Sequence, residues 1–220
     1  MREAYRFVRE GEARPIDGAP APARKRESDK DEGKAFTNMT LPIILRDMEH
    51  KESANISISL RLPVVEDVPI YFQYLQNPKV TIWLEDACQY PMTYPQIENF
   101  VLGPAWFRRA IEFQGRFIGM TGLEEPDLAR GVARFFFVIG DPALWGKGLG
   151  EAVLREVIHV GFTDLGLRKI VSNCLAPNEA SLAVHKKLGF EVEGCLREDA
   201  WRNGQWVDHL LLALRQTDED

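Results

Sequence analysis

The sequence predicts an α+β fold, in which a mixed and mostly antiparallel sheet carries helices on both faces. Residues 132–139 form a β-branched and aromatic run of strand length, followed by a glycine-rich turn and then a helical pattern. Two turn signals, at residues 114–115 and 203–204, each separate two further runs of strand length. Strand pairs joined by tight turns, combined with a few longer helical patterns, are typical of this class.

The first half of the predicted domain alternates a strand, several helices and a hairpin. Apolar residues at every second position from Ile56 to Leu62 predict the first strand. The pattern predicts a helix from Glu66 to about Leu75, which stops near Asn77 and Pro78. It then predicts shorter helices at 81–84 and 94–101, and strands at 106–112 and 116–123.

The second half is built around one long amphipathic helix. After a strand at 133–139, a helix begins at Glu151, and its apolar residues repeat at spacings of three and four: Val153, Leu154, Val157, Ile158, Gly161 and Phe162. A strand at 169–175 follows. A second helix then runs from Asn178 to a C-terminal glycine at Gly189. Strands at 190–198 and 205–214 complete the sheet.

Residues 1–54 differ in composition from residues 55–217, which we expect to form the folded domain. Mixed-charge runs at 24–27 and 29–32 flank the proline- and alanine-rich segment 19–23. Such a segment cannot bury enough apolar area to offset its ordering entropy, so we expect a disordered, charged extension. Only residues 41–45 are apolar enough to dock on the domain.

The composition favours a cytoplasmic protein that does not bind nucleic acid. The 220-residue chain has a net charge of −6, which argues against a nucleic-acid partner and mildly favours a cationic substrate. Cys88, Cys174 and Cys195 show neither disulfide nor metal-ligand spacing, so we expect reduced thiols and no metal site. We expect no transmembrane span, signal peptide or membrane partner, and a monomer or homodimer.

The run Trp145-Gly146-Lys147-Gly148-Leu149-Gly150 has the features of a phosphate-binding turn. Glycines allow a tight turn and leave no Cβ to block a ligand, and the following helix offers unpaired N–H groups and a positive dipole end. Two familiar motifs do not match, because Glu151 replaces the third Rossmann glycine and Gly148 replaces the Walker hydroxyl. A glycine turn that only joins a strand to a helix is the alternative.

The residues that follow give this turn a family context. Asn178-Glu179-Ala180-Ser181 opens the second predicted helix, Lys187-Leu188-Gly189-Phe190 closes it, and Trp201–Asp208 follows. Together with the glycine run, these motifs resemble the GNAT superfamily of acyl-CoA N-acyltransferases, over about residues 56–214. Trp145 stands where the general motif has Gln or Arg. Trp-Gly-Lys-Gly is similar to the branch that acetylates ribosomal-protein N-termini.

The resemblance implies acetyl-CoA as cosubstrate, held where two neighbouring strands diverge. It assigns the pantetheine arm and the thioester carbonyl to the backbone near Val138 and Ile139. It assigns the pyrophosphate to the loop, namely Trp145, Gly146, Lys147, Gly148, Leu149 and Gly150. Asn178 is expected to bond the cofactor arm or a water, and capping of the helix that it precedes is the simpler role.

Two residues on the second helix are candidate proton donors to the departing CoA sulfur. The resemblance to the ribosomal-protein branch implies Ser181, whereas many GNAT enzymes have a tyrosine at the position that His185 occupies here. Each has a simpler alternative: Ser181 could bond its own backbone, and His185 could be a solvated surface residue. His159 and His209 look structural, and His50 lies in the extension.

No residue is an obvious general base, because no glutamate lies within 133–139, where some relatives carry one. Glu124 and Glu125 are the nearest substitutes, and a surface pair is the simpler interpretation. The resemblance places the acceptor site in the segment between the first two strands. Trp83, Glu85, Asp86 and Tyr90 are therefore candidates, although an isolated aromatic there is more often part of the core.

The leading hypothesis is an N-acetyltransferase that moves the acetyl group of acetyl-CoA to a primary amine by direct attack. A peptide α-amine near pKa 7.8 is about one-seventh neutral at pH 7, whereas a lysine-like amine is neutral only about once in 2,500. A weakly equipped site therefore favours a peptide N-terminus or an amino sugar. The alternative is a GNAT-like domain that binds acyl-CoA as a sensor or interaction module without turnover.

Overall fold

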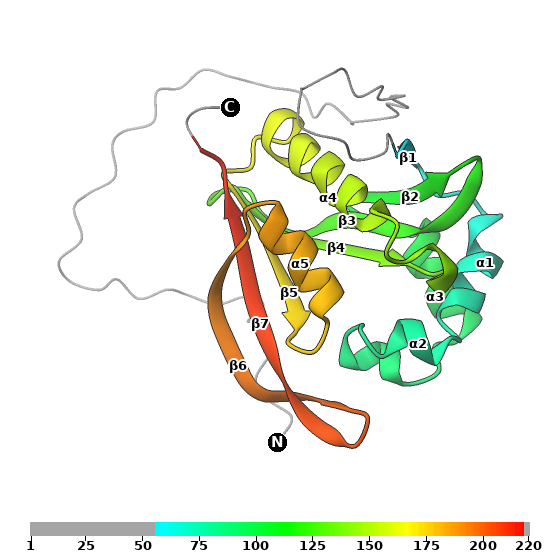
Figure 1. Cartoon of the computed structure of the whole chain (residues 1–220). Coiled ribbons are helices and arrows are strands. Elements are labelled where there is room, and N and C mark those ends of the chain that lie inside the picture. The colour runs from blue at the N-terminus through cyan, green and yellow to red at the C-terminus, as the bar shows by residue number, and fades with distance from the viewer. Residues whose placement is uncertain (1–55, 218–220) are drawn as a thin grey trace, which may run out of the picture. The chain divides into compact units, whose positions relative to one another are not determined.

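The computed structural model describes residues 56–217, in which seven strands form one sheet in the order β1-β2-β3-β4-β5-β7-β6 (Figure 1). Neighbouring strands are antiparallel except β4 and β5, which are parallel. The strands are β1 (Ile58–Arg61), β2 (Phe107–Phe113), β3 (Arg116–Asp127), β4 (Val132–Ile139), β5 (Lys169–Leu175), β6 (Glu191–Arg202) and β7 (Gln205–Arg215). The predicted α+β class is confirmed.

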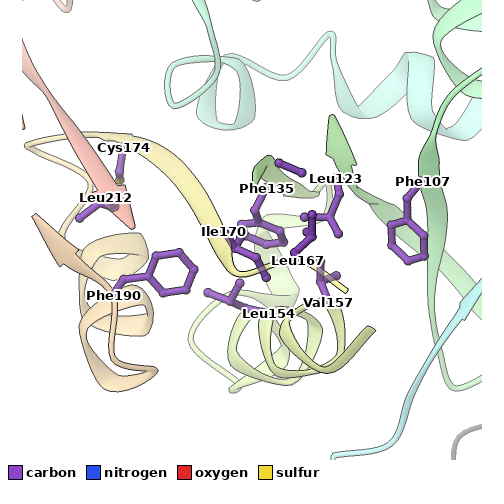
Figure 2. Packing of buried hydrophobic residues seen from close by; sticks show 11 residues of the cluster. Phe107, Leu123, Phe135, Leu154, Val157, Leu167, Ile170, Cys174, Phe190 and Leu212 are labelled. Carbon is purple, nitrogen blue, oxygen red and sulfur yellow. The ribbon is translucent and has the colours of Figure 1, made fainter. Parts of the chain in front are cut away.

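Helices cover both faces of this sheet, as the sequence predicts. The helical elements are α1 (Asp67–Tyr74), α2 (Pro78–Thr81), η1 (Asp86–Gln89), α3 (Tyr94–Leu102), η2 (Pro142–Leu144), α4 (Leu149–His159), η3 (Val160–Asp164) and α5 (Glu179–Lys187). On one face, Leu154 and Val157 of α4 pack against Phe135 and Ile170, as Figure 2 shows. On the other face, α1 and α3 pack against alternate residues of β2, β3 and β4. Strand alternation therefore sends successive side chains to two separate cores.

The parallel pair β4–β5 is the point at which the sheet opens. Its pairing covers only Val132–Arg134 against Lys169–Val171. Beyond these residues the two strands diverge, as the arrows of β4 and β5 in Figure 1 show. The remaining residues of β5 still pair with β7 on their other side, up to Leu175 with His209. One edge of each diverging strand thus lacks a strand partner within the described residues.

The element bounds differ most from the predicted ones at the second helix and at the ends of β3 and β6. The helix predicted at 81–84 lies earlier, at Pro78–Thr81, because Asn77 caps its start. The Asn77 side chain accepts a hydrogen bond from the N–H of Lys79. Strands β3 and β6 run four residues further than predicted, and both contain register shifts. The predictions for the extension concern residues that lie outside the described part of the chain.

Among residues 56–217, none of the helices combines the length and the hydropathy that a membrane span requires. The three cysteines are unpaired thiols, with Cys174 buried and Cys195 exposed.

Candidate functional site

The glycine-rich run folds into a tight turn between β4 and α4. Gly146 and Gly148 have φ angles of 73° and 79°, in the left-handed region that residues with a Cβ disfavour. A Cβ on Gly146 would meet no atom within 4 Å, so the space beside this glycine is open. The indole N–H of Trp145 donates to the carbonyl of Ile139 at 2.8 Å, which ties the turn to the end of β4. The turn is thus anchored at one side and open at the other.

Helix α4 begins directly after this turn without a side chain to cap it. Its N-cap residue is Gly148, which has no side chain to bond the first N–H groups. The unpaired amides and the positive end of the helix dipole therefore remain available to an anion. This is the chemical requirement of a diphosphate.

A cavity of about 810 Å³ extends from this turn through the gap between β4 and β5. Its walls include most of the predicted cofactor residues: Val138, Ile139, Trp145, Gly146, Gly148, Leu149, Gly150 and Asn178. Lys147 is the exception, since it is exposed and does not line the cavity. Lys147 lies within the turn, so its charge can act on a bound anion only from the edge of the cavity.

Asn178 and Ser181 stand at the start of α5, on one side of the cavity. The Asn178 side chain accepts a hydrogen bond from the N–H of Ser181 at 3.2 Å, so the capping role considered for Asn178 is present. The Ser181 hydroxyl lies 3.5 Å from Nδ1 of His185. Because both residues line the cavity, their side chains can also meet a ligand.

His185 is buried, with only 2% of its surface exposed, rather than solvated on the helix surface. Its Nδ1 lies 2.8 Å from the Ser181 carbonyl and its Nε2 lies 3.0 Å from the Ser172 hydroxyl. Since a carbonyl can only accept, Nδ1 carries the proton and Nε2 accepts from Ser172. Burial lowers the pKa of His185, and the bond to the Ser181 carbonyl opposes this in part. The neutral ring therefore has both nitrogens occupied.

The opposite wall of the cavity carries charged and aromatic residues from the segment between α2 and η1, from α3 and from β3 and β4: Trp83, Glu85, Phe100, Glu124 and Arg134. Arg134 of β4 forms ion pairs with Glu85, Glu124 and Glu125. Glu124 also faces Arg108 at 3.6 Å, so both of its oxygens lie near guanidinium groups. Of the predicted acceptor residues, Trp83 and Glu85 line the cavity, whereas Asp86 and Tyr90 do not.

Arg202 at the tip of the β6–β7 hairpin holds this wall in place. Its guanidinium donates to the carbonyls of Ile82 and Leu84 at 2.8 and 2.7 Å, and to Asp86 at 2.8 Å. The residue is 6% exposed. A hairpin far away in the sequence thus anchors the segment that contains Trp83 and Glu85.

The sequence did not single out Asn173, Arg134, Arg202 or His209 as functional residues. His209 lines the cavity and pairs with Asp199, although it looks structural in the sequence. A signal was available: Val207, His209 and Leu211 share one strand face, and a histidine between two apolar residues is unusual there. Within residues 56–217, no group of acidic, histidine and cysteine side chains could hold a metal ion.

Comparisons with known proteins agree with this geometry. The sequence model of the acetyltransferase (GNAT) domain matches residues 57–191. The chain is 31% identical to spermidine N(1)-acetyltransferase of Escherichia coli over 162 residues, which cover 73% of this chain and 87% of that enzyme. It is 27% identical to an uncharacterized N-acetyltransferase, p20, of Bacillus licheniformis, over 71% of this chain and 92% of that protein.

Solved structures share the fold at lower identity. Spermidine N-acetyltransferase from Vibrio cholerae, in complex with CoA and spermine, superposes with a TM-score of 0.65 at 24% identity, over 72% of this chain and 95% of that one. The ribosomal L7/L12 alpha-N-protein acetyltransferase RimL, in complex with CoA, gives 0.65 at 22% identity, over 76% of this chain and 97% of that one.

The family match extends from β1 to the start of β6, so it includes the glycine turn, the diverging strands and Asn178. The chain therefore belongs to the GNAT family, as an N-acetyltransferase that uses acetyl-CoA as cosubstrate.

Proposed function

We propose that this enzyme transfers the acetyl group of acetyl-CoA to a primary amine by direct attack of the amine nitrogen. The observation that carries the proposal is the continuous cavity between β4 and β5, which joins an anion-binding turn to a charged and aromatic wall. One end has the chemistry for a diphosphate and the other has room for an amine. Both substrates can therefore be present together, as direct attack requires.

In this proposal the turn at 145–150 and the first N–H groups of α4 hold the pyrophosphate. The free edge of β4 near Val138 and Ile139 would bond the pantetheine arm, because its N–H and C=O groups have no strand partner on the β5 side. A backbone N–H there would also polarise the thioester carbonyl, as an oxyanion hole does. Asn178 would bond the arm from the other side of the gap.

Ser181 is the residue that we assign as proton donor to the departing sulfur. Nδ1–H of His185 is directed at the Ser181 carbonyl, so His185 does not accept the hydroxyl proton of Ser181. The lowered pKa of His185 keeps its ring neutral and unsuited to proton donation at neutral pH. His185 then acts as a positioning residue that fixes the first turn of α5, instead of the catalytic acid that its place in the sequence suggests.

The acceptor that we propose is the α-amine of a peptide, as in the ribosomal-protein branch that the sequence resembles. The carboxylates at the acceptor wall, Glu85 and Glu124, are engaged by Arg134, which leaves little free negative charge to attract a polyamine. A larger fraction of an α-amine is neutral at pH 7 than of an alkylamine. We also propose a cytoplasmic location, consistent with three unpaired thiols.

The test is release of CoA thiol from acetyl-CoA in the presence of an amine panel. The panel contains short peptides with free N-termini, the same peptides with blocked N-termini, an amino sugar and spermidine. Turnover that is highest with free peptide N-termini supports the proposal. Higher turnover with spermidine would show that the acceptor is a polyamine instead of a peptide α-amine. Binding of acetyl-CoA without turnover of any amine would favour a sensor module.

A further inference from the structure

We propose that His209 is the general base that accepts the proton of the attacking amine, and that Asp199 orients it. This inference rests on the proposed amine acetylation, and it assigns the one role that the sequence left open. It is carried by the position of His209 in the cavity, its pairing with Asp199 and the bulge that produces this pairing.

The strand register places His209 on the acceptor side of the sheet. His209 of β7 is directly opposite Leu175 of β5, so the two side chains lie on the same face. Leu175 belongs to a small cluster with Ala200 and Val207, whereas its neighbour Cys174 packs into the core beneath α4 and α5. His209 therefore lies on the face opposite to α5, and it lines the same cavity as Ser181.

The pairing with Asp199 fixes which ring nitrogen can act. Nδ1 of His209 lies 3.2 Å from Oδ2 of Asp199. A carboxylate only accepts, so Nδ1 carries the proton and Nε2 holds the lone pair. Among residues 56–217, Nε2 has no hydrogen-bond partner, and Asp199 does not line the cavity. This is the arrangement of a base whose orienting group stands behind it.

A bulge in β6 brings Asp199 to this position. The register of β6 against β7 shifts between Leu196 and Ala200, and within the shift Glu198 adopts a left-handed φ of 52°. That conformation is unfavourable for a residue with a Cβ. The N–H of Glu198 donates to Oδ1 of Asp208 at 2.9 Å, which stabilises the bulge. Bulges often redirect a side chain beside an active site, and strained residues concentrate there.

The other charged groups around the cavity are less suited to this role. Both oxygens of Glu124 face the guanidinium groups of Arg108 and Arg134. His185 of α5 has both ring nitrogens occupied. Of the charged and titratable groups around His209, Asp199 contacts its ring, Asp208 is its neighbour on β7, and Cys195 of β6 contacts Asp208. Glu179 of α5 and Glu85, Glu124 and Arg134 line the same cavity.

With His209 and Ser181 on opposite faces, the two proton transfers occur at opposite sides of the thioester. The amine nitrogen forms the new bond to the acetyl carbon and gives its proton to Nε2 of His209. The bond between carbon and sulfur breaks, and the thiolate takes the hydroxyl proton of Ser181. His209 then releases its proton to solvent through the open cavity, and Ser181 regains one. Atoms and charges balance without a further reactant.

The experiment measures kcat/KM across pH 6 to 9 for the full-length wild type, His209→Gln and Asp199→Asn, with a peptide acceptor. We expect His209→Gln to lose about 10²–10³ in kcat/KM, within the range of general-base catalysis, and to lose the acidic limb of the profile. Asp199→Asn should lose at least about tenfold, because an amide favours the wrong tautomer. The dissociation constant of acetyl-CoA and the melting temperature should stay close to wild type for both.

His159→Gln is the matched control, since His159 lies on α4 away from this cavity, with Thr163 as its neighbour. It should retain the wild-type profile. As a readout independent of turnover, the imidazole nitrogen shifts of His209 should report the Nδ1–H tautomer in wild type and change in Asp199→Asn. A His209→Gln variant with wild-type kcat/KM and pH profile would overturn the assignment while amine acetylation stands. A wild type that turns over no amine would overturn both.

Discussion

At the scale of single residues, His185 shows how burial changes what a histidine can do. Its ring packs edge-on against Phe190, with centroids 4.9 Å apart, and against Phe135. The sequence offered an imidazole one helical turn after Ser181, which favoured either a catalytic acid or a solvated surface residue. Neither the burial nor the partner Ser172 could be predicted, because Ser172 is brought to α5 only by the packing of β5.

The lowered pKa of His185 predicts a pH-dependent stability. Between the lowered pKa of the folded state and the ordinary value near 6.5, the unfolded chain binds more protons, so the free energy of unfolding decreases as the pH falls. Acidification from about pH 7.5 to about pH 5.5 should therefore lower the melting temperature of the wild type more than that of His185→Phe. At the higher pH the variant should be less stable by about 1–3 kcal/mol, because the Ser172 hydroxyl loses its acceptor.

Thermal unfolding at several pH values measures both effects, with His159→Gln as the control for an exposed histidine. If the melting temperature changes equally with pH in the wild type and in His185→Phe, His185 is not buried in its neutral state.

Ser181→Ala separates proton donation from packing at the same helix turn. The cap between Asn178 and the N–H of Ser181 involves the backbone, so it survives the substitution. We expect kcat at saturating acetyl-CoA to fall at least about tenfold, since the thiolate loses its donor. Ser172→Ala is the comparison, because its hydroxyl bonds His185 beneath α5. Equal losses in the two variants would show that Ser181 contributes only to the packing.

At the scale of elements, two glycines with the same backbone conformation test the cofactor turn. Gly146 and Gly115 have φ angles of 73° and 71°, and a Cβ at either would meet no atom within 4 Å. An aspartate at either position pays a similar conformational cost. Only Gly146 lines the cavity, so Gly146→Asp adds negative charge where the pyrophosphate is proposed to bind.

The dissociation constant of acetyl-CoA, measured by calorimetry, should rise at least about tenfold in Gly146→Asp, which corresponds to about 1.4 kcal/mol. Gly115→Asp should bind like the wild type and lose a similar amount of stability. Unchanged affinity in both variants would remove the turn from the cofactor site.

The Arg202 anchor belongs to the same scale, because it joins the β6–β7 hairpin to the wall that contains Trp83 and Glu85. Lysine in place of Arg202 cannot reproduce donors in three directions, so carbonyls after α2 lose their partners. We expect Arg202→Lys to raise KM for the amine about tenfold and to leave the acetyl-CoA affinity unchanged. Arg130→Lys, an exposed ion pair with Asp127, is the control. A change in acetyl-CoA affinity instead would mean that the hairpin shapes the cofactor end.

Local sequence patterns were sufficient to predict most helices and strands, because these elements depend on residues that are neighbours in the sequence. The alternation of Ile58 and Leu60, and the turn at Gln114 and Gly115, occur where they are predicted. The site depends on contacts across the sheet. Arg202 and Ile82 are 120 positions apart, and the pairing of His209 with Asp199 requires a bulge that no local pattern signals. Long-range contacts of this kind are the part that the sequence could not specify.

At the scale of the whole molecule, the net charge differs from the charge that the acceptor wall presents. The net charge of −6 does not translate into a free acidic surface at the acceptor wall, because Arg134 and Arg108 pair with the carboxylates there. Overall charge therefore says less about the acceptor than the arrangement of these few residues. The family match begins at residue 57, close to the predicted boundary of the folded domain.

The composition of residues 1–54 predicts that the domain does not need them. Mixed charges and the proline- and alanine-rich segment offer little apolar area to the core, apart from residues 41–45. A chain that begins at residue 54 keeps Ile56, which packs against the cluster containing Ile118 and Leu149 near the start of α4. We expect its melting temperature and its acetyl-CoA affinity to equal those of the full chain. A second variant that retains residues 41–54 is the matched comparison. If stability drops by several degrees only when residues 41–53 are also removed, the apolar segment packs on the domain, and the predicted boundary at residues 54–55 is wrong.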